Sequence, residues 1–361
     1  MLTLGVETSC DETSCAILED DSRILSNIVS SSLFRHQEFG GVVPEIASRH
    51  CLEQIDAVYH EALKEARIQP SDIDLIAATQ GPGLIGSLFV GVSFAKALSY
   101  ALGIPLIGVN HLEAHLLANF IDQPEPEKYI GLLVSGGHTS LTYHEHGKIC
   151  LLGSTVDDAI GEAFDKVAKI LGLGYPGGPA IEELAIKGDP RAIPFTKPKQ
   201  TNPFDFSFSG IKTAVLYFVE KKNFERRDIK QIGKSIRKGR SKESVYIKPS
   251  QQEEAPWLRD LAASFQHAVT QWVVQKTVAA AKDKKVKTIA VGGGVSANTY
   301  LRAQLQEVAR EEGLKIYFPP LSLTVDNAAM IARRGVELYR NGKRSEMTLS
   351  GVPNLVLGGK S

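Results

Sequence analysis

Residues 2–18 (LTLGVETSCDETSCAIL) and 130–143 (IGLLVSGGHTSLTY) share one pattern, in which an apolar β run leads through a turn of small or polar residues into a second β run. This pattern is typical of a β-hairpin. A third segment, residues 287–298 (KTIAVGGGVSAN), repeats the apolar run and the small-residue turn. A hairpin at the start of each half of the chain indicates two related α/β lobes that face each other across a cleft.

Helical patterns separate these segments, at residues 48–66, 84–102 and 157–171. Residues 84–109 are the most apolar part of the chain, but Lys96 interrupts them, and Gly103 and Pro105 are typical of a helix end followed by a new strand. We therefore expect a buried helix and strand here rather than a membrane span.

The composition excludes a global electrostatic attraction to nucleic acid or membranes. The 361 residues include 41 Lys and Arg and 41 Asp and Glu, so any such affinity must be local. The four cysteines form no C-x-x-C pair, and the N-terminus has no basic segment followed by an apolar one. We therefore expect a protein of the reducing cytoplasm.

Residues 221–254 depart from the α/β pattern. From residue 221 to 248 there are 11 basic and three acidic residues with few apolar positions, a composition that cannot bury a core. We expect an exposed insertion. Such a charge run is most often a solvated surface, but this excess of positive charge is also what contact with a phosphate backbone requires.

Two histidines lie four residues apart in residues 110–115 (NHLEAH), at the predicted start of a helix. At about 100° per residue, His111 and His115 project from nearly the same helix face and can share one divalent ion. Glu113 lies roughly 200° around the helix from them, unlike the Glu of the protease motif H-E-x-x-H, which directly follows the first His. Glu113 is therefore a poor candidate for activating a metal-bound water. Taken alone, the pair fits an ordinary surface or core pair as well as a metal site.

Two glycine-rich turns could bind a phosphate. The turn at residues 134–138 (VSGGH) directly follows a predicted strand, so main-chain N–H groups can approach an anion, although hairpins use the same residues. The turn at residues 292–298 (GGGVSAN) also follows a β run and precedes a helix that starts near Asn298, a geometry suited to a nucleotide. Neither G-x-G-x-x-G nor the P-loop motif is present, which disfavours a Rossmann dehydrogenase and a P-loop NTPase.

Several acidic residues have both a functional and a structural interpretation. Asp165 lies in a predicted helix, where it can bind ribose hydroxyls or pair with a lysine four residues later. Asp326 begins another predicted helix, where an Asp is usually a helix cap. As a metal ligand, it would complete a set of two His and one carboxylate that leaves coordination positions open. Glu7, Asp11 and Glu12 lie close together at the first turn, where carboxylates can position a water, a metal or an attacking amine, or can simply be turn residues.

Together these motifs closely resemble those of the tRNA N6-adenosine threonylcarbamoyltransferase (TsaD/Gcp) family, whose members were formerly described as O-sialoglycoprotein endopeptidases. The resemblance spans nearly the whole chain. Its segments are residues 7–13 (ETSCDET), 40–45 (GGVVPE), 81–84 (GPGL), 95–97 (AKA), 108–115 (GVNHLEAH), 134–139 (VSGGHT), 164–166 (FDK), 175–179 (YPGGP), 206–212 (FSFSGIK), 292–298 (GGGVSAN) and 326–328 (DNA). The chain departs from the family at Ser140, where many members have Gln, and in the basic stretch, which is longer than in the typical member.

The resemblance implies an actin-like, sugar-kinase-like fold of two lobes with a nucleotide cleft between them. The N-terminal lobe would comprise residues 1–112 plus 326–361, and the C-terminal lobe residues 113–325 with a basic exposed insertion at about 221–254. The implied metal ligands are His111, His115 and Asp326. The implied nucleotide contacts are Leu133, Val134, Ser135, Gly136, Gly137, Asp165, Gly178 and Asn298, with Glu182 as a further ribose contact in some members. Asp11 and Glu12 match an acidic turn near the reacting centre, although neither is an unambiguous base.

The resemblance also implies a reaction. The threonylcarbamoyl group of threonylcarbamoyl-adenylate would move to the N6 amine of the adenosine 3′ of the anticodon, in tRNAs that read codons beginning with A. One divalent metal ion per subunit, iron first and zinc second, would assist, with an adenylate or ATP-type nucleotide in the cleft. The implied partners are tRNA, the adenylate donor, an inactive TsaB-like paralogue and a small TsaE-like ATPase, in the cytoplasm and without a membrane. Two alternatives stay open, namely a metallopeptidase and an actin-like ATP-binding module that regulates its partners.

Overall fold

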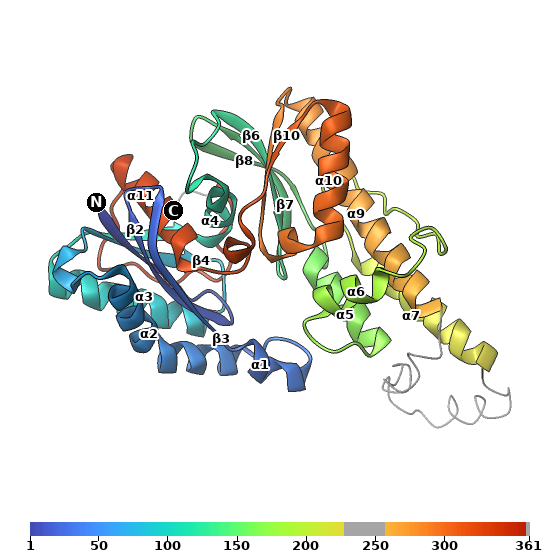
Figure 1. Ribbon diagram of the computed structural model, residues 1–361, viewed down its shortest axis with the longest axis horizontal. Helices are drawn as coiled ribbons and strands as arrows, with labels where there is room; N and C mark the ends of the chain where they lie inside the picture. The colour runs from blue at the N-terminus through green and yellow to red at the C-terminus, as the bar shows by residue number, and fades with distance from the viewer. Residues whose placement is uncertain (227–256, 359–361) are drawn as a thin grey trace.

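Two five-stranded mixed sheets, one in each lobe, form the framework of the protein (Figure 1). The computed structural model describes residues 1–226 and 257–358. The predicted basic insertion therefore lies outside the described residues, apart from its start, which continues a helix.

The first sheet has the strand order β3-β2-β1-β4-β5. Its strands are β1 (Leu2–Glu7), β2 (Glu12–Glu19), β3 (Arg23–Ser31), β4 (Leu75–Gly81) and β5 (Leu106–Asn110). Strands β1, β2 and β3 pair antiparallel in sequence, whereas β4 and β5 run parallel to β1.

The second sheet repeats this connectivity in the order β8-β7-β6-β9-β10. Its strands are β6 (Lys128–Val134), β7 (Thr139–Glu145), β8 (Lys148–Ser154), β9 (Thr288–Gly292) and β10 (Lys315–Tyr317). Again the first three strands pair antiparallel and the last two run parallel to the first. Both predicted hairpins and the prediction of two related α/β lobes are confirmed.

Helices connect the strands and cover both sheets. They are α1 (Leu33–His36), α2 (Pro44–Ala66), α3 (Ile85–Leu102), α4 (His111–Leu117), α5 (Ile160–Leu171), α6 (Gly177–Ala185), α7 (Ser209–Arg226), α9 (Trp257–Asp283), α10 (Thr299–Glu312) and α11 (Ala328–Arg340). The three helices predicted from periodicity are confirmed as α2, α3 and α5. Helix α2 begins earlier than predicted, because Pro44 occupies a first-turn position that suits proline.

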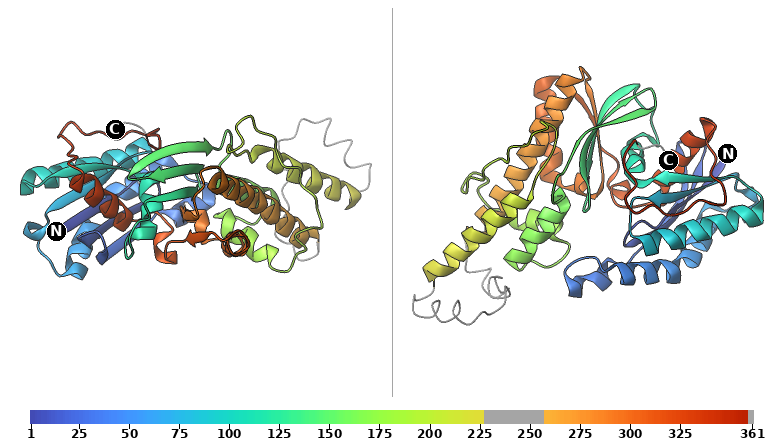
Figure 2. Two further views of the ribbon diagram at one scale, coloured as in Figure 1. Left: turned by 90° about the horizontal axis from the view of Figure 1, so that it is seen from above. Right: turned by 180° about the vertical axis from the view of Figure 1, so that it is seen from behind.

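Side chains alternate between the two faces of the first sheet, as the pleat of a strand requires. Leu4 and Val6 lie in one buried cluster with residues of α2 and α3, whereas Ala16 and Leu18 lie in another with residues of α11. Helix α11 comes from the far end of the chain, yet it packs on the sheet that the first hairpin begins (Figure 2). On this basis we propose the lobe boundaries stated above, residues 1–112 plus 326–361 and residues 113–325.

Helix α4 lies between the two sheets. It follows β5 directly, and its neighbours include β6 and β9 of the second sheet as well as α11 of the first lobe. The opposite face of the second sheet is covered by α5 and α9, whose Phe164 and Phe265 pack edge to face at 5.0 Å between ring centroids. The first residue of α4 therefore enters the junction of the two lobes.

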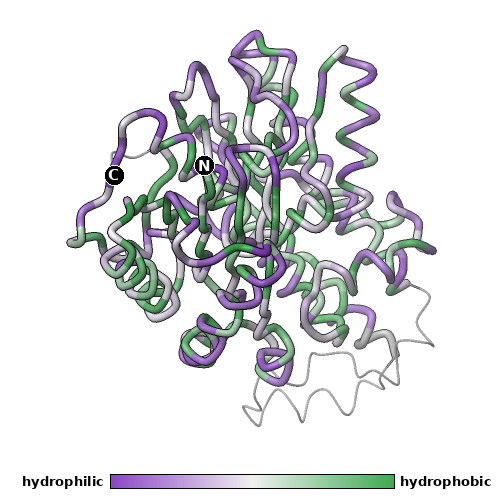
Figure 3. Tube along the Cα trace, turned by 60° about the vertical axis from the view of Figure 1, so that its left-hand side comes forward, coloured by the Kyte–Doolittle hydropathy of each residue, from purple (hydrophilic) through white to green (hydrophobic). Residues whose placement is uncertain are grey.

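The prediction that α3 is buried is only partly right. One face packs on α2 and β4, but Phe89 and Tyr100 are 70% and 82% exposed. Within the described part of the chain, α3 alone is long and apolar enough to cross a membrane by length and composition, a test that a helix of a globular lobe also passes. Figure 3 shows hydrophobic and hydrophilic residues alternating along the outer helices, as expected for helices with one covered face.

Candidate active site

Helix α4 begins where the sequence predicts. Asn110 caps it, since its side-chain oxygen accepts hydrogen bonds from the main-chain N–H groups of Leu112 at 3.0 Å and Glu113 at 3.3 Å. The cap fixes the first turn so that His111 and His115 project from one face. Both are buried, with exposed fractions of 7% and 1%.

Asp326 approaches this face from a segment 211 residues further along the chain. The helix predicted to start at Asp326 instead starts at Ala328, because Asn327 is the cap and accepts a hydrogen bond from Met330 N at 3.1 Å. The predicted capping role of Asp326 is thus taken by its neighbour. The Asp326 carboxylate is free to turn toward α4.

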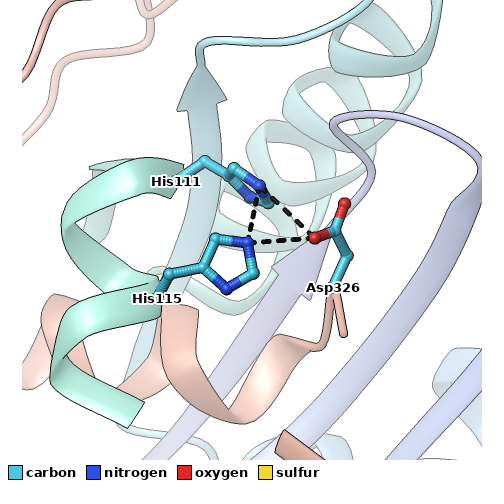
Figure 4. A group of neighbouring side chains, drawn as sticks. All are labelled: His111, His115 and Asp326. Carbon is cyan, nitrogen blue, oxygen red and sulfur yellow. Dashed lines mark hydrogen bonds and ion pairs between the residues drawn. The ribbon is translucent and has the colours of Figure 1, made fainter. Parts of the chain in front are cut away.

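The three predicted ligands converge (Figure 4). The two imidazole Nε2 atoms lie 3.1 Å apart, and Asp326 Oδ1 lies 3.0 Å from Nε2 of His115 and 3.5 Å from Nε2 of His111. Bonds of about 2.1 Å to a tetrahedral ion place ligand atoms about 3.4 Å apart. His115 Nδ1 is buried without a hydrogen-bond partner among the described residues, so Nε2 is its only nitrogen engaged. The arrangement fits one divalent metal ion held by two Nε2 atoms and one carboxylate oxygen.

The electrostatics of this group also fit a cation. Burial lowers the pKa of His111, but the carboxylates of Glu7 and Asp326 outweigh burial and raise that pKa to about 9. Burial and the charge of His111 lower the pKa of His115. Burial opposes ionisation of Asp326, yet the two histidines and Ser9 hold the pKa of its carboxyl well below its usual value. At neutral pH His111 is therefore protonated and positively charged, and it lies beside the ionised carboxylate of Asp326.

Glu7 orients the first ligand, which is a more specific role than the sequence predicted for the carboxylates of the first turn. It is fully buried, and its carboxylate accepts hydrogen bonds from Thr79 Oγ1 at 2.6 Å and Ser9 N at 2.5 Å, while Oε2 lies 2.9 Å from His111 Nδ1. A carboxylate on the second nitrogen of a metal-binding His fixes the ring and makes Nε2 a better ligand. The available signal was an acid at the end of the otherwise apolar strand β1.

Both lobes line a cavity of about 810 Å³ beside these residues. His111 and Asp326 border it, whereas His115 lies behind them. The other predicted residues that line it are Asp11, Glu12, Ser135, Gly136, Gly137 and Asp165. Residues that were not predicted also line it, among them Lys166, Lys169 and the C-terminal Pro353 and Asn354. No local sequence pattern signals that the C-terminal segment reaches this cavity.

The Ser-Gly-Gly turn between β6 and β7 presents open main chain to the cavity. A Cβ on Gly136 or Gly137 would meet nothing within 4 Å, and within the described residues their N–H groups have no hydrogen-bond partner. Gly293 packs against the start of this turn. Its φ of 89° disfavours a side chain, and a Cβ added there would lie 2.5 Å from Val134 O, so no side chain fits at this position. This geometry matches the predicted phosphate cradle.

The remaining predicted nucleotide contacts lie outside the cavity lining. Leu133 and Val134 are fully buried in β6. Asn298 caps α10 and binds Gln266 Oε1 at 3.0 Å, and Glu182 Oε1 accepts hydrogen bonds from Thr299 N at 2.7 Å and Thr299 Oγ1 at 2.5 Å. Glu182 and Asn298 therefore meet at the start of α10.

Two further segments connect the cavity lining to the predicted positions Gly178 and Asn298. Gly178 lies one residue after Gly177, whose N–H donates to Asp165 Oδ1 at 2.7 Å, and a Cβ on Gly178 would meet nothing within 4 Å. Gly294 lines the cavity and begins the 3₁₀ turn Gly294–Ala297 that leads to Asn298. The space beside Gly178 is thus open where an added Cβ would lie.

Glu12 differs electrostatically from an ordinary surface carboxylate. Burial raises its pKa well above the usual value, and the nearby charges of Asp326 and Asp11 raise it further. Ser31 donates a hydrogen bond to it at 3.1 Å, which acts in the opposite direction. When ionised, a carboxylate with a raised pKa accepts a proton more readily than an ordinary surface carboxylate.

The chain matches a family model described as tRNA N6-adenosine threonylcarbamoyltransferase over residues 23–333. Curated proteins with the same description align over nearly the whole chain. The protein of Thermosipho africanus is 49% identical, with 98% of this chain and 99% of that protein covered. The protein of Dictyoglomus turgidum is 48% identical, with 99% of each covered, and that of Clostridioides difficile is 45% identical, with 98% of each covered.

Solved structures of distant proteins share the fold. Full-length HypF in its phosphate- and nucleotide-bound form superposes with a TM-score of 0.57 at 14% identity, covering 94% of this chain and 46% of HypF. HypF of T. kodakarensis superposes with a TM-score of 0.60 at 14% identity, covering 94% of this chain and 48% of that protein. The predicted actin-like, sugar-kinase-like fold of two lobes is confirmed.

Proposed function

Because this chain belongs to the tRNA N6-adenosine threonylcarbamoyltransferase family, and is therefore a transferase, we propose that it moves a threonylcarbamoyl group from threonylcarbamoyl-adenylate to tRNA. The acceptor is the N6 amine of the adenosine 3′ of the anticodon, in tRNAs that read codons beginning with A. The observation that carries the proposal is the shared cavity, in which His111 and Asp326 lie with the open Ser-Gly-Gly turn.

His111, His115 and Asp326 would hold the divalent ion, with Glu7 fixing the ring of His111. Such an ion supplies Lewis-acid stabilisation and a template for the threonylcarbamoyl end of the donor. Two imidazoles and one carboxylate accommodate iron or zinc. Iron is our first expectation and zinc our second.

The donor is a mixed anhydride, so its phosphate carries the negative charge that grows as AMP leaves. The N–H groups of Gly136 and Gly137, which have no partner among the described residues, would stabilise that charge. Asp165 would accept hydrogen bonds from ribose hydroxyls, and Gly178, Glu182 and Asn298 would contact the rest of the nucleoside.

The amine attacks the carbamoyl carbon, the bond from this carbon to the phosphate oxygen breaks, and AMP leaves. The amine nitrogen loses one proton after attack. Glu12, with its raised pKa, accepts that proton, and Asp11 orients the amine from the same turn. No protein nucleophile is needed, because both substrates are held in one cavity.

Glu113 argues against the metallopeptidase alternative. It is 8% exposed and bound to Arg334, whose Nη2 lies 2.6 Å from Glu113 Oε2. It therefore has no free carboxylate to activate a water. An ATP-binding regulatory module would explain the cleft, but would not need three converging ligands at its edge.

The partners we propose are a TsaB-like inactive paralogue and a small TsaE-like ATPase, in the cytoplasm. Leu52 of α2 and Ile85 and Phe89 of α3 are each more than half exposed on the N-terminal lobe. We propose that these exposed apolar side chains contact a protein partner.

The test is a single-turnover reaction with labelled threonylcarbamoyl-adenylate and tRNA, with the partners present. Mass spectrometry of digested tRNA quantifies the modified adenosine, and AMP release is followed in parallel. His111→Ala and Asp326→Asn should each abolish transfer, whereas His60→Ala, at an exposed histidine of α2, should not. No modified adenosine from the unaltered chain would overturn the transfer proposal. Transfer at the normal rate by His111→Ala would overturn the metal part alone.

A further inference from the structure

The metal ligands lie on two elements that the chain does not connect directly. His111 and His115 share α4, so the helix itself fixes their separation. Asp326 lies just before α11, and nothing along the backbone fixes its distance from α4. The contact between α4 and α11 therefore sets the geometry of the group.

Helix α4 contributes a single apolar side chain, the small Ala114, to the buried cluster that includes α11, to which α11 also contributes the larger Met330 and Ile331. The same cluster includes three alanines of α11. Alanines allow two helices to approach closely, but they interlock less than large side chains. This surface alone specifies the register of the helices weakly.

A buried ion pair joins the same two helices. Arg334 of α11 donates to Glu113 Oε2 from Nη2 at 2.6 Å and from Nε at 3.0 Å. Both residues are 8% exposed. Arg334 Nη1 also lies 2.9 Å from Glu337, and Gly358 N donates to Glu113 Oε1 at 3.3 Å. The pair is thus held on both sides, by α11 and by the C-terminal segment.

The position of Glu113 makes this pair relevant to the ligands. It lies midway between His111 and His115 in sequence and borders a separate cavity of about 380 Å³, which His111 does not line. A shift or rotation of α4 that moved the two imidazoles would also break the Glu113 contact. A buried, hydrogen-bonded ion pair is suited to specifying one register among several of similar energy.

We propose that Glu113 and Arg334 are positioning residues that set the distance between the two histidines and Asp326, and through it the affinity for the metal ion. This inference rests on the metal site of the proposed function. The pair touches neither the ion nor the substrates, and acts only by holding α4 against α11.

The test separates positioning from stability by removing both charges of the pair at once, while Glu337 keeps Arg333 as an ion-pair partner at 4.0 Å. Replacing a buried ion pair with apolar residues of similar volume is often neutral for stability, whereas removing one partner is not. The variant is therefore Glu113→Met/Arg334→Met. The matched control is Asp21→Asn/Arg340→Met, because that pair also lies 2.6 Å apart and also anchors α11, but is exposed and does not reach α4.

The probe is Co²⁺ alone, titrated into metal-free protein against a competing chelator, with its visible spectrum recorded. Thermal unfolding of the metal-free proteins is measured alongside. We expect the Glu113→Met/Arg334→Met protein to unfold within a few degrees of the unaltered chain, to bind Co²⁺ ten- to a hundredfold more weakly, and to give an altered spectrum. The control should match the unaltered chain in all three measurements.

Unaltered Co²⁺ affinity and spectrum in the Glu113→Met/Arg334→Met protein would overturn the inference. So would loss of folding in that protein, because the pair would then be a stability element. Failure of the metal site itself is distinguishable. In that case the unaltered chain would bind no Co²⁺, or His111→Ala would bind it equally well.

Discussion

Gly161 offers a direct test of the phosphate cradle, because it is where α5 touches the Ser-Gly-Gly turn. A Cβ added to Gly161 would lie 2.7 Å from Ser135 O and 2.7 Å from Gly136 Cα, and ordinary contacts begin at 3.4 Å. Gly161→Ala must therefore displace the turn by about 0.7 Å, the shortfall between those two distances. Since misplacing a reacting group by about 1 Å can cost on the order of a hundredfold in rate, we expect kcat/KM for the donor to fall roughly tenfold or more.

Gly210 provides a matched control for Gly161. It occupies the same second position in α7, and a Cβ there would meet nothing within 4 Å. Gly210→Ala should keep kcat/KM and raise stability by about 0.4–1 kcal/mol, because it lowers the entropy of the unfolded chain. The assay measures donor kcat/KM at saturating tRNA, with thermal unfolding to verify folding. A Gly161→Ala enzyme within twofold of Gly210→Ala would refute the assignment of this turn to the donor phosphate.

Three further substitutions test Glu7, His144 and Lys169. Glu7→Gln should weaken metal binding about ten- to a hundredfold, or roughly 1.4–2.8 kcal/mol, because it removes the charge behind His111. Competition with a chelator measures the metal affinity, and an unchanged affinity would contradict this role of Glu7. Burial lowers the pKa of His144 from 6.5 to about 3, so the unfolded chain takes up a proton below pH 6.5 that the folded chain does not. Stability is thus lost as pH falls from 6.5 toward 3. Between pH 7.5 and 5, the free energy of unfolding measured in urea should fall by about 2 kcal/mol more in the unaltered chain than in His144→Phe. Equal losses in the two proteins would be inconsistent with a neutral buried ring. Lys169 lines the cavity without an ion-pair partner among the described residues. Lys169→Ala should therefore raise KM for tRNA several-fold and lower the slope of log affinity against log salt concentration by about one, the value of one phosphate contact. An unchanged slope would exclude that contact.

Local patterns were sufficient for much of the fold. Apolar alternation and small-residue turns are properties of a few consecutive residues, and they located β1, β2, β6, β7 and β9. The spacing of His111 and His115 was equally local, because one helix turn fixes their common face. These predictions needed no knowledge of the tertiary structure.

The rest depends on packing between distant segments. Asp326 meets His111 only because α11 packs on the first sheet, and no spacing between residues 111 and 326 encodes that contact. Glu7 orients His111 through a strand-to-helix contact of the same kind. Periodicity also cannot tell which apolar face of a helix is left uncovered, as the exposed Phe89 of α3 shows.

We propose that α4 and the segment before α11 form one metal centre at the edge of a nucleotide cleft. Anomalous diffraction from crystals of the protein grown with Zn²⁺ and a non-reactive adenylate analogue tests it most directly. The account predicts one anomalous peak bonded to Nε2 of His111, Nε2 of His115 and a carboxylate oxygen of Asp326, with the analogue phosphate against Gly136 and Gly137. A peak elsewhere, or none at these three residues under conditions where the analogue is bound, would contradict it.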